Sequence, residues 1–193
     1  MKIYSFLISE SFSTEDSLKY ESDLFKELGN DKAVLFEFRG QESANIGFFS
    51  GKNDCSPIDQ DCSNLLYWFW LGGHGNYDSG INRKMEFNCC DTSWATHYKQ
   101  LQRVNTPEIL SDMEFRSFWT DFDNGLVRVG KGDIVGSNII LEYQTDILAP
   151  KYIGFMTGWG TVGSWTIKTT ITTPGSMLIY FLSFAQVSLI SKD

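Results

Sequence analysis

The stretch from residue 118 to residue 165 constrains the fold most strongly, because hairpin chemistry lies there between alternating apolar residues. Residues 118–122 read FWTDF, and period-two alternation of this kind is typical of a half-buried β-strand. The dipeptide Asn-Gly follows at 124–125, and this pair between apolar runs is the strongest short-range signal for a β-hairpin. Residues 126–130, LVRVG, supply the returning strand. The stretch therefore predicts a twisted antiparallel sheet.

Short strand-like segments recur along the rest of the chain. They are rich in β-branched and aromatic residues and are separated by turn residues, which is typical of an all-β sandwich or barrel. The predicted strands cover residues 33–39, 45–49, 65–71, 81–88, 94–104, 118–122, 126–130, 139–143, 151–156 and 165–172, with one or two strands or a short buried helix in the apolar tail 177–190. We therefore expect an antiparallel β-sandwich, jelly-roll-like or lectin-like, that forms a single domain over residues 1–193.

Two N-terminal segments leave alternatives open. Residues 1–8, MKIYSFLI, fit either a first strand or the trimmed start of a longer precursor. Residues 14–29 have a suitable helix cap in Thr14 and a suitable helix end in Gly29, but their apolar stripe is ragged. This segment predicts either one short N-terminal helix or extended structure.

The composition is that of a folded chain rich in aromatic residues and acidic overall. Aromatic residues make up 15% of the 193 residues, and the formal net charge is -8. A nucleic-acid-binding protein needs a basic stripe that neutralises phosphates, and none is visible. Anionic membrane surfaces are disfavoured for the same reason. No run of about 18 apolar residues occurs, so we expect no membrane insertion.

The four cysteines indicate whether the protein folds in an oxidising or a reducing compartment. Cys55 and Cys62 bracket a polar loop, whereas Cys89 and Cys90 are adjacent. More than one disulfide pairing is open, and free buried thiols are the alternative. Zinc is disfavoured because the spacings are not of the CxxC type and the histidines are isolated. A disulfide favours an oxidising compartment, so we expect an extracellular or cell-surface location.

Residues 158–163, GWGTVG, spell the glycine fingerprint of dinucleotide-binding proteins. That chemistry needs a helix to begin at the glycine turn, with its N-terminus facing the pyrophosphate. Residues 164–171 are poor helix formers and good strand formers. We therefore expect a tight turn between two strands, with Trp159 and Trp165 covering the core, and we predict no cofactor.

No other motif predicts catalysis or metal binding. Residues 121–125 resemble the start of a calcium loop, but Leu126 and Gly132 stand where an EF-hand needs glycine and glutamate. No GxSxG nucleophile motif is present, and neither His74 nor His97 has a partner that the sequence identifies. The sequence therefore assigns no catalytic residue and no metal ligand.

Aromatic faces beside polar groups are the usual chemistry of shallow recognition sites. Trp68 and Trp70 share one face of a predicted strand, and a glycine-rich break follows that strand. In the predicted hairpin, an aromatic and a carboxylate residue likewise share one face. The candidate ligand-binding residues are Trp68, Trp70, His74, Asn76, Trp119 and Asp121.

Three ordered segments resemble one known family. Residues 71–84, LGGHGNYDSGINRK, are similar to its segment IGGxxNxxSxIRR. Residues 118–132, with FW and GLVRVGKG, resemble FWxxxxxGxIxVGxG, and residues 152–165, with YIGFMTGWG and SW, resemble YVGxSTGWGSxGxW. Together they resemble the farnesoic acid O-methyltransferase-like domain over residues 33–168.

The resemblance implies a β-sandwich module that occurs alone or within larger, often extracellular proteins. The family name implies methylation of a sesquiterpenoid acid with S-adenosylmethionine, yet the chain offers no strand-helix-strand unit of the kind that methyltransferases use for this cofactor. His74 stands where the family commonly has an aromatic residue, and the loop from Cys55 to Cys62 resembles an insertion.

The leading functional hypothesis is a non-catalytic extracellular binding or assembly module whose ligand is a carbohydrate or a protein, with self-association as one form of assembly. One alternative is an O-methyltransferase that acts on a farnesoic-acid-like carboxylic acid. Another is a structural subunit of a surface coat or polymer.

Overall fold

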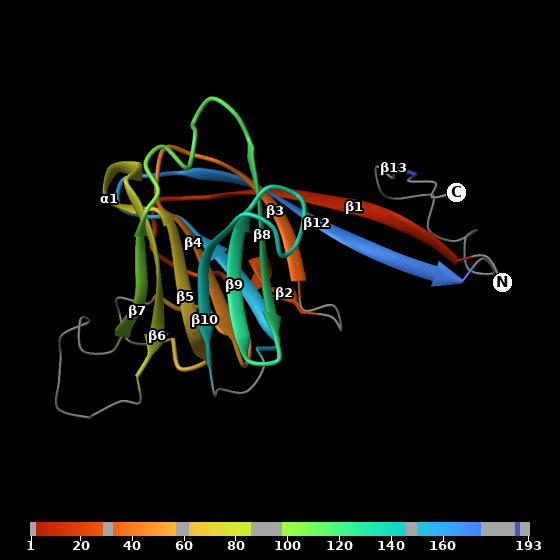
Figure 1. Ribbon diagram of the computed structural model, residues 1–193, viewed down its shortest axis with the longest axis horizontal. Helices are drawn as coiled ribbons and strands as arrows, with labels where there is room; N and C mark the ends of the chain where they lie inside the picture. The colour runs from red at the N-terminus through yellow and green to blue at the C-terminus, as the bar shows by residue number, and fades with distance from the viewer. Residues whose placement is uncertain are drawn as a thin grey trace.

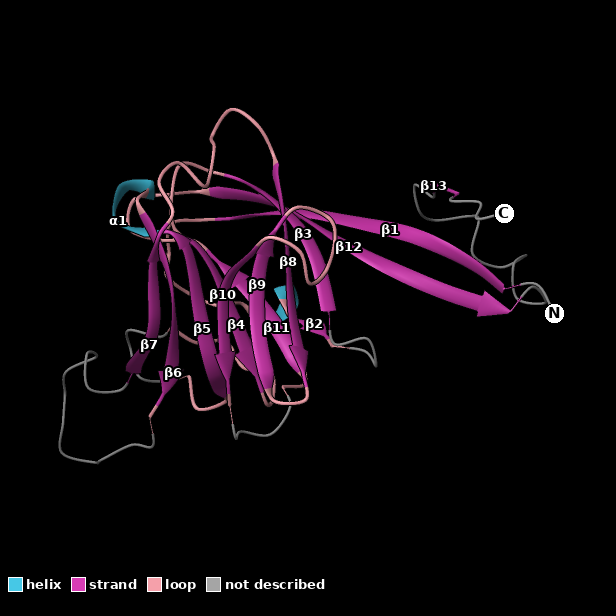
Figure 2. Cartoon of the chain, viewed as in Figure 1, coloured by secondary structure: helices cyan, strands magenta, loops and turns pink. Residues whose placement is uncertain are grey.

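The computed structural model describes residues 3–28, 33–56, 62–85, 98–145, 150–174 and 188–189. These residues are almost entirely β-structure, arranged as two facing sheets (Figures 1 and 2). Every ladder between their strands is antiparallel. The predicted antiparallel β-sandwich is confirmed.

The first sheet has seven strands in the order β10-β9-β8-β3-β12-β1-β13. These are β10 (Ile139–Gln144), β9 (Leu126–Lys131), β8 (Arg116–Asp123), β3 (Ala33–Arg39), β12 (Gly163–Pro174), β1 (Ile3–Thr14) and β13 (Ser188–Leu189). The predicted hairpin is its β8–β9 pair, in which Asp123 lies opposite Leu126. Asn124 and Gly125 form the turn, and both have positive φ, which is the geometry that favours this dipeptide.

The second sheet has six strands in the order β2-β11-β4-β5-β6-β7. These are β2 (Lys26–Glu27), β11 (Tyr152–Met156), β4 (Ala44–Phe49), β5 (Leu65–Gly72), β6 (Asp78–Lys84) and β7 (Tyr98–Asn105). A 3-10 turn η1 (Ser22–Leu24) and a four-residue turn α1 (Gly73–Asn76) complete the elements. Each predicted strand within the described residues corresponds to an observed strand, although some ends differ: β6 begins at Asp78 and ends at Lys84, and β11 begins at Tyr152. Residues 86–97 and most of the tail 177–190 lie outside the described residues.

The core between the sheets consists of residues that alternate along the strands. Tyr67, Phe69 and Leu71 of β5 form one buried cluster with Phe118 and Phe122 of β8. A strand places successive side chains on opposite faces, so the period-two pattern in the sequence selects the residues of this core.

Trp165 of β12 lies within this core and is fully buried, as the sequence predicts. Its ring centroid is 4.5 Å from that of Phe38 and 5.0 Å from that of Phe155. Its indole Nε1 donates a hydrogen bond of 2.8 Å to Thr14 Oγ1. Both sheets and strand β1 therefore meet at this side chain.

Strands β1 and β12 pair along their whole length and extend away from the two sheets as a ribbon (Figure 1). Ile3 lies opposite Pro174, whereas the pairing of β12 with β3 ends at Lys168. The first strand that the sequence allows within residues 1–8 is therefore present from Ile3 onwards.

Of the two alternatives for residues 14–29, extended structure prevails over the described residues 14–28, whose only helical element is the single 3-10 turn η1. Tyr20 and Phe25 of this segment pack on the outer face of the six-stranded sheet, and Lys26 and Glu27 then join its edge as β2. Tyr20 exchanges two backbone hydrogen bonds with Cys55, of 2.7 and 3.0 Å. The rings of Tyr20 and Phe25 lie 5.0 and 4.5 Å from that of Phe49. The ragged apolar stripe could not bury one helical face, and the extended path buries the two aromatic residues individually.

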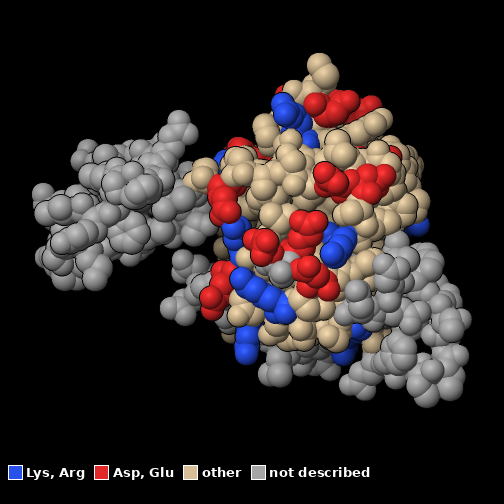
Figure 3. Space-filling model, turned by 180° about the vertical axis from the view of Figure 1, so that it is seen from behind, with Lys and Arg blue, Asp and Glu red and all other residues tan. Residues whose placement is uncertain are grey.

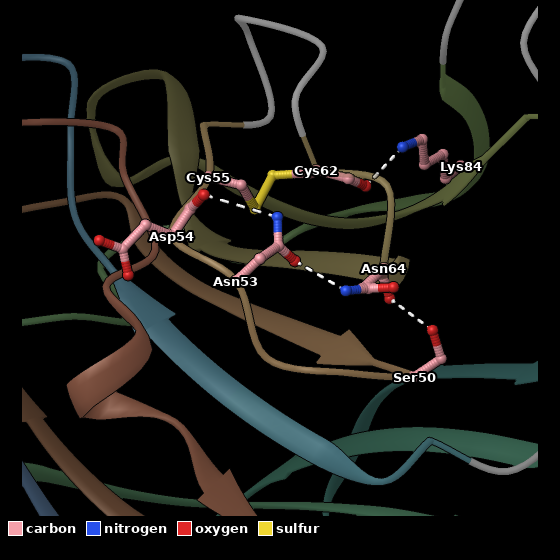
Figure 4. Close-up of a disulfide and its surroundings, with 7 residues drawn as sticks. All are labelled: Ser50, Asn53, Asp54, Cys55, Cys62, Asn64 and Lys84. Atoms are coloured by element: carbon pink, nitrogen blue, oxygen red, sulfur yellow. Dashed lines mark hydrogen bonds between the residues drawn. A yellow bond between two sulfur atoms is a disulfide. The ribbon is translucent and has the colours of Figure 1, made fainter.

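One of the candidate disulfides is present (Figure 4). Cys55 and Cys62 are bonded, with Cα atoms 4.9 Å apart. Lys84 Nζ donates a hydrogen bond to the carbonyl of Cys62, which ties the loop to β6. Cys89 and Cys90 lie outside the described residues, so their pairing stays a prediction.

Figure 3 shows one face of the surface, on which acidic and basic side chains are interspersed and form no continuous basic stripe. No helix in the described ranges is long and apolar enough to span a bilayer.

Replacing both Cys55 and Cys62 with serine should lower the free energy of unfolding by about 2.5 kcal/mol, because the bond removes loop-closure entropy from the unfolded chain. Urea unfolding of the variant and of the oxidised wild type measures the difference. An unchanged midpoint and slope would contradict a stabilising bond at this position.

Candidate functional site

A cleft of about 550 Å³ lies on the outer face of the six-stranded sheet. Aromatic side chains form its floor, and charged or amide side chains form its edge. We call it the aromatic cleft, and its lining residues are Glu42, Ser43, Trp68, Trp70, Gly73, His74, Asn82, Tyr98, Gln100, Arg103 and Trp159.

Strand β5 supplies the floor because its residues alternate between the two faces of the sheet. Trp68 and Trp70 point away from the core that Tyr67 and Phe69 enter. Their ring centroids are 6.1 Å apart. Trp68 Nε1 donates a hydrogen bond of 2.8 Å to Asn45 Oδ1 on β4, so the orientation of this indole is fixed from the neighbouring strand.

Two glycines allow the indole of Trp70 to lie flat against the backbone. A Cβ atom on Gly80 would stand 2.1 Å from Trp70 Cζ2, and one on Gly73 would stand 2.6 Å from Trp70 Cδ1. Gly80 also lies opposite Trp70 in the β5–β6 ladder. Glycine at these positions therefore lets the ring lie flat on β6 while it lines the cleft.

Trp159 lines the aromatic cleft together with Trp68 and Trp70, and it is the aromatic member of the site that the sequence did not identify as a ligand-binding residue. It was expected to cover the core, but its side chain is 49% exposed and lines the aromatic cleft. The predicted tight turn is present: Trp159 and Gly160 have φ of 56° and 88°, and the amide of Thr161 donates to the carbonyl of Gly158 over 3.3 Å. This turn holds the Trp159 ring parallel to that of Trp68, with centroids 5.9 Å apart and an interplanar angle of 2°.

A buried carboxylate organises the polar edge. Asp78 at the start of β6 is 1% exposed and accepts hydrogen bonds from Arg103 Nε over 2.7 Å and from Trp70 Nε1 over 3.3 Å. Arg103 Nη2 also donates to it, and His74 Nδ1 lies 3.0 Å from its Oδ1. Asp78 thereby fixes one aromatic, one cationic and one imidazole side chain of the cleft.

The pKa of Asp78 reflects opposing influences. Burial raises it, whereas the hydrogen bonds from His74, Arg103 and Trp70 lower it, and the net direction is downward. The carboxylate is therefore the form that the folded cleft stabilises.

The glycine-rich break after β5 forms the left-handed turn α1. Gly72, His74, Gly75 and Asn76 have φ between 52° and 74°, a region that L-residues rarely occupy. The Glu42 carboxylate accepts a 2.7 Å hydrogen bond from the amide of Gly75. These contacts place His74 at the mouth of the cleft, with 63% of its side chain exposed.

Asn76 is directed elsewhere. Its Nδ2 donates to the carbonyl of Leu110 over 2.9 Å, and its Oδ1 accepts from the amide of Leu110 over 3.0 Å. It does not line the aromatic cleft. Its predicted contact with a ligand stays a prediction, and the role that its bonds support is to hold the loop after β7.

Trp119 and Asp121 lie on the outer face of the other sheet, because Phe118 and Phe122 on the same strand face the core. Trp119 is buried, and its Nε1 donates to the carbonyl of Ser137 over 2.8 Å. Asp121 accepts from Arg128 Nε over 2.9 Å. The structure thus separates this predicted pair from the tryptophans of β5 by the full thickness of the sandwich.

Side chains of the protein fill the space beside two glycines of the dinucleotide-binding fingerprint, where a bound cofactor would need to lie. A Cβ on Gly158 would stand 2.0 Å from Leu18 Cδ2, and one on Gly163 would stand 2.3 Å from Phe38 Cε2. The segment leads into strand β12 and not into a helix. These glycines therefore serve close packing and a turn, and the described residues here do not fit the methyl-donor cofactor that the resemblance implies.

Within the described ranges, no group of three or more histidine, cysteine, aspartate or glutamate side chains is placed to hold a metal ion.

A family profile described as farnesoic acid O-methyl transferase matches residues 14–171. The chain belongs to this family. The match includes the three segments that carry the resemblance and extends beyond them to the segment that crosses the six-stranded sheet. No curated protein matches the chain.

Solved structures with a similar shape include three that cover most of this chain. The exoplasmic/lumenal domain of VIP36 in a Ca²⁺- and Man3GlcNAc-bound form has a TM-score of 0.48 at 6% identity, over 96% of this chain and 93% of that one. Sheep galectin-11 in complex with glycerol has a TM-score of 0.43 at 11% identity, over 77% and 96%. The carbohydrate-binding module CBM66 from Bacillus subtilis has a TM-score of 0.41 at 8% identity, over 89% and 83%.

Replacing Gly80 with alanine should displace the indole of Trp70 and lower the free energy of unfolding by about 1–3 kcal/mol, because the new Cβ overlaps a ring that is held by Asp78. Chemical unfolding measures the loss, and the tryptophan emission spectrum reports the displacement. Gly51→Ala is the matched control, since its Cβ would meet only the flexible amide of Asn64. Equal behaviour of the two variants would contradict the close packing.

Acid should weaken the fold through Asp78. Its folded-state pKa lies below the unfolded value of about 3.9, so the carboxylate stabilises the fold above that pH, and the contribution is lost as pH falls through the folded pKa. Urea unfolding from pH 6 to pH 3 should show the wild type losing its advantage over Asp78→Asn below about pH 4. Asp112→Asn changes the same charge at an exposed site and should show no such convergence with the wild type.

Proposed function

We propose that this protein is a non-catalytic carbohydrate-binding module and that the aromatic cleft is its ligand site. The observation that carries this proposal is the combination of a fixed aromatic floor with a fixed polar edge in one hollow. Sugar rings present apolar C–H faces and hydroxyl edges, so they need both kinds of surface at once.

The aromatic part of the site is held ready before a ligand binds. Trp70 lies against glycine backbone and is hydrogen-bonded to Asp78, and Trp159 stacks on Trp68. Trp159 is more exposed than Trp68 and Trp70, so it presents most of the accessible aromatic surface of the cleft. A rigid platform loses little conformational entropy on binding, which favours affinity for a small polar ligand.

The charges at the edge favour a neutral sugar over an acidic one. Both Nε and Nη2 of Arg103 already bind the carboxylate of Asp78, and the Glu42 carboxylate lies at the rim. A ligand carboxylate would meet this second acid and a guanidinium that is already neutralised. Hydroxyl groups can donate to Glu42 and accept from the free nitrogens of Arg103, Asn82 and Gln100.

The Cys55–Cys62 bond supports an extracellular or cell-surface setting for this activity, because disulfides persist in oxidising compartments. The volume of the cleft lies in the range of sites that enclose small ligands.

A glycan array with neutral and acidic saccharides, probed with the oxidised protein, tests the proposal, and titration calorimetry then measures the best binder. We expect neutral saccharides to bind.

Two further measurements test the alternative functions. S-adenosylmethionine is titrated in parallel, and size-exclusion chromatography with light scattering reports self-association. A silent array with saturable cofactor binding would favour the methyltransferase, and a silent array with self-association would favour the structural subunit. Either result overturns the proposal.

Replacing Trp159 or Trp70 with alanine should weaken binding of the best saccharide about tenfold, because each removes an aromatic face worth about 1 kcal/mol or more. Ile134→Ala is the control, since Ile134 is 70% exposed and lies outside the aromatic cleft. Unchanged affinity in both tryptophan variants, each shown to be folded by circular dichroism, would exclude the aromatic cleft as the binding site.

A further inference from the structure

A second hollow of about 380 Å³ lies beside the aromatic cleft. Its lining differs in kind, because it has no aromatic ring: hydroxyl, amide and charged side chains line it together with turn backbone and the apolar side chain of Val162. The side chains that matter here are Ser13, Arg39, Gln41, Asp112 and Ser164. We call it the polar hollow.

Two loops contribute to both sites. The turn after β3 supplies Gln41 to the polar hollow and Glu42 to the aromatic cleft. The turn after β11 supplies Trp159 to the aromatic cleft and the next residue, Gly160, to the polar hollow. The two turns also touch, since a Cβ on Gly40 would stand 3.1 Å from the carbonyl oxygen of Val162. The two sites are therefore neighbours on one rim of the sandwich.

Arg39 lines the polar hollow, and its guanidinium forms no ion pair with a carboxylate among the described residues. The guanidinium of Arg39 lies 5.0 Å from the centroid of the Phe115 ring, and no ion pair of Arg39 occurs in the described part of the chain. Arg128 and Lys168, by contrast, each bind carboxylates. The guanidinium of Arg39, which Phe115 supports from one side, keeps its N–H donors available to a ligand.

The hollow offers acceptors as well as donors. Asp112 is exposed and adds a carboxylate to the lining, while Ser13, Gln41 and Ser164 can both donate and accept. A neutral ligand with many hydroxyl groups satisfies this set, whereas an apolar ligand would leave its groups unpaired.

We propose that the two sites together bind one neutral oligosaccharide, with one sugar ring on the tryptophans of the aromatic cleft and a following unit in the polar hollow. The ligand chain crosses the turn at Trp159 and Gly160, where a Cβ added to Gly160 would meet no atom within 4 Å. This inference rests on the proposed function and adds that the ligand is a chain and not a single sugar.

The test is a calorimetric titration of the wild type with cello-, manno-, chito- and galacto-oligosaccharides of increasing length, from one to about six units. For the series that binds, affinity should rise by about tenfold or more between the single sugar and the longest chain, because a second set of charge-assisted hydrogen bonds is added.

Arg39→Ala and Asp112→Asn should remove most of this gain with length, about tenfold for the arginine variant, and should leave the affinity for the shortest bound sugar unchanged. Trp159→Ala should weaken binding of every length. Lys131→Ala, which removes an exposed cation from β9 outside both sites, should change neither. Circular dichroism and unfolding midpoints establish that each variant is folded.

Affinity that does not depend on length, or equal loss for short and long chains in Arg39→Ala, would overturn the extended site and leave the carbohydrate-binding proposal standing. No binding at any length would overturn both.

Discussion

The structure depends on one strand that is buried on both faces. On its inner face, β5 places Tyr67, Phe69 and Leu71 in the core, and on its outer face it places Trp68 and Trp70 in the aromatic cleft. A strand alternates its side chains by geometry, so the same eight residues support the sandwich and build its recognition surface. A change of one residue in the register would exchange the two sets.

Several contacts convert that surface into a fixed site. The buried carboxylate of Asp78 binds Trp70, His74 and Arg103 at once. An unpaired buried carboxylate is costly, and the three donors remove that cost while they fix their own positions. Any larger residue at position 73 or 80 would place a Cβ atom against the Trp70 ring and lift it from the sheet, and glycine avoids this overlap. The aromatic cleft is therefore held by hydrogen bonds and backbone contact, and it needs no ligand to assemble.

The chain belongs to a family whose description names a methyl transfer, and this raises the question of where a methyl-donor cofactor would lie. The segment that spells a nucleotide fingerprint is a turn that Leu18 and Phe38 pack against, and a strand follows it. A glycine can be required for the absence of a side chain, for positive φ or for close approach of a ligand, and the letters alone do not distinguish these requirements. In this chain, the first two account for the glycines. The same turn presents Trp159 to the cleft, so its role in recognition comes from the tryptophan and not from the glycines.

The sequence by itself determined the class of fold and most strand positions, because alternation and the Asn-Gly turn are local properties. It also selected Trp68, Trp70 and His74, which meet in the aromatic cleft, whereas Asn76, Trp119 and Asp121 lie outside it. The path of residues 14–28 was decided by packing of Tyr20 and Phe25 on the sheet, which outweighed a weak helical propensity. Only the tertiary structure brought Arg103 and Glu42 to the edge of the cleft, turned Trp159 outward and placed Trp119 on the opposite face. Local patterns fix which face of its own strand a residue occupies, but neighbours from strands distant in sequence arise only when the sheets are assembled.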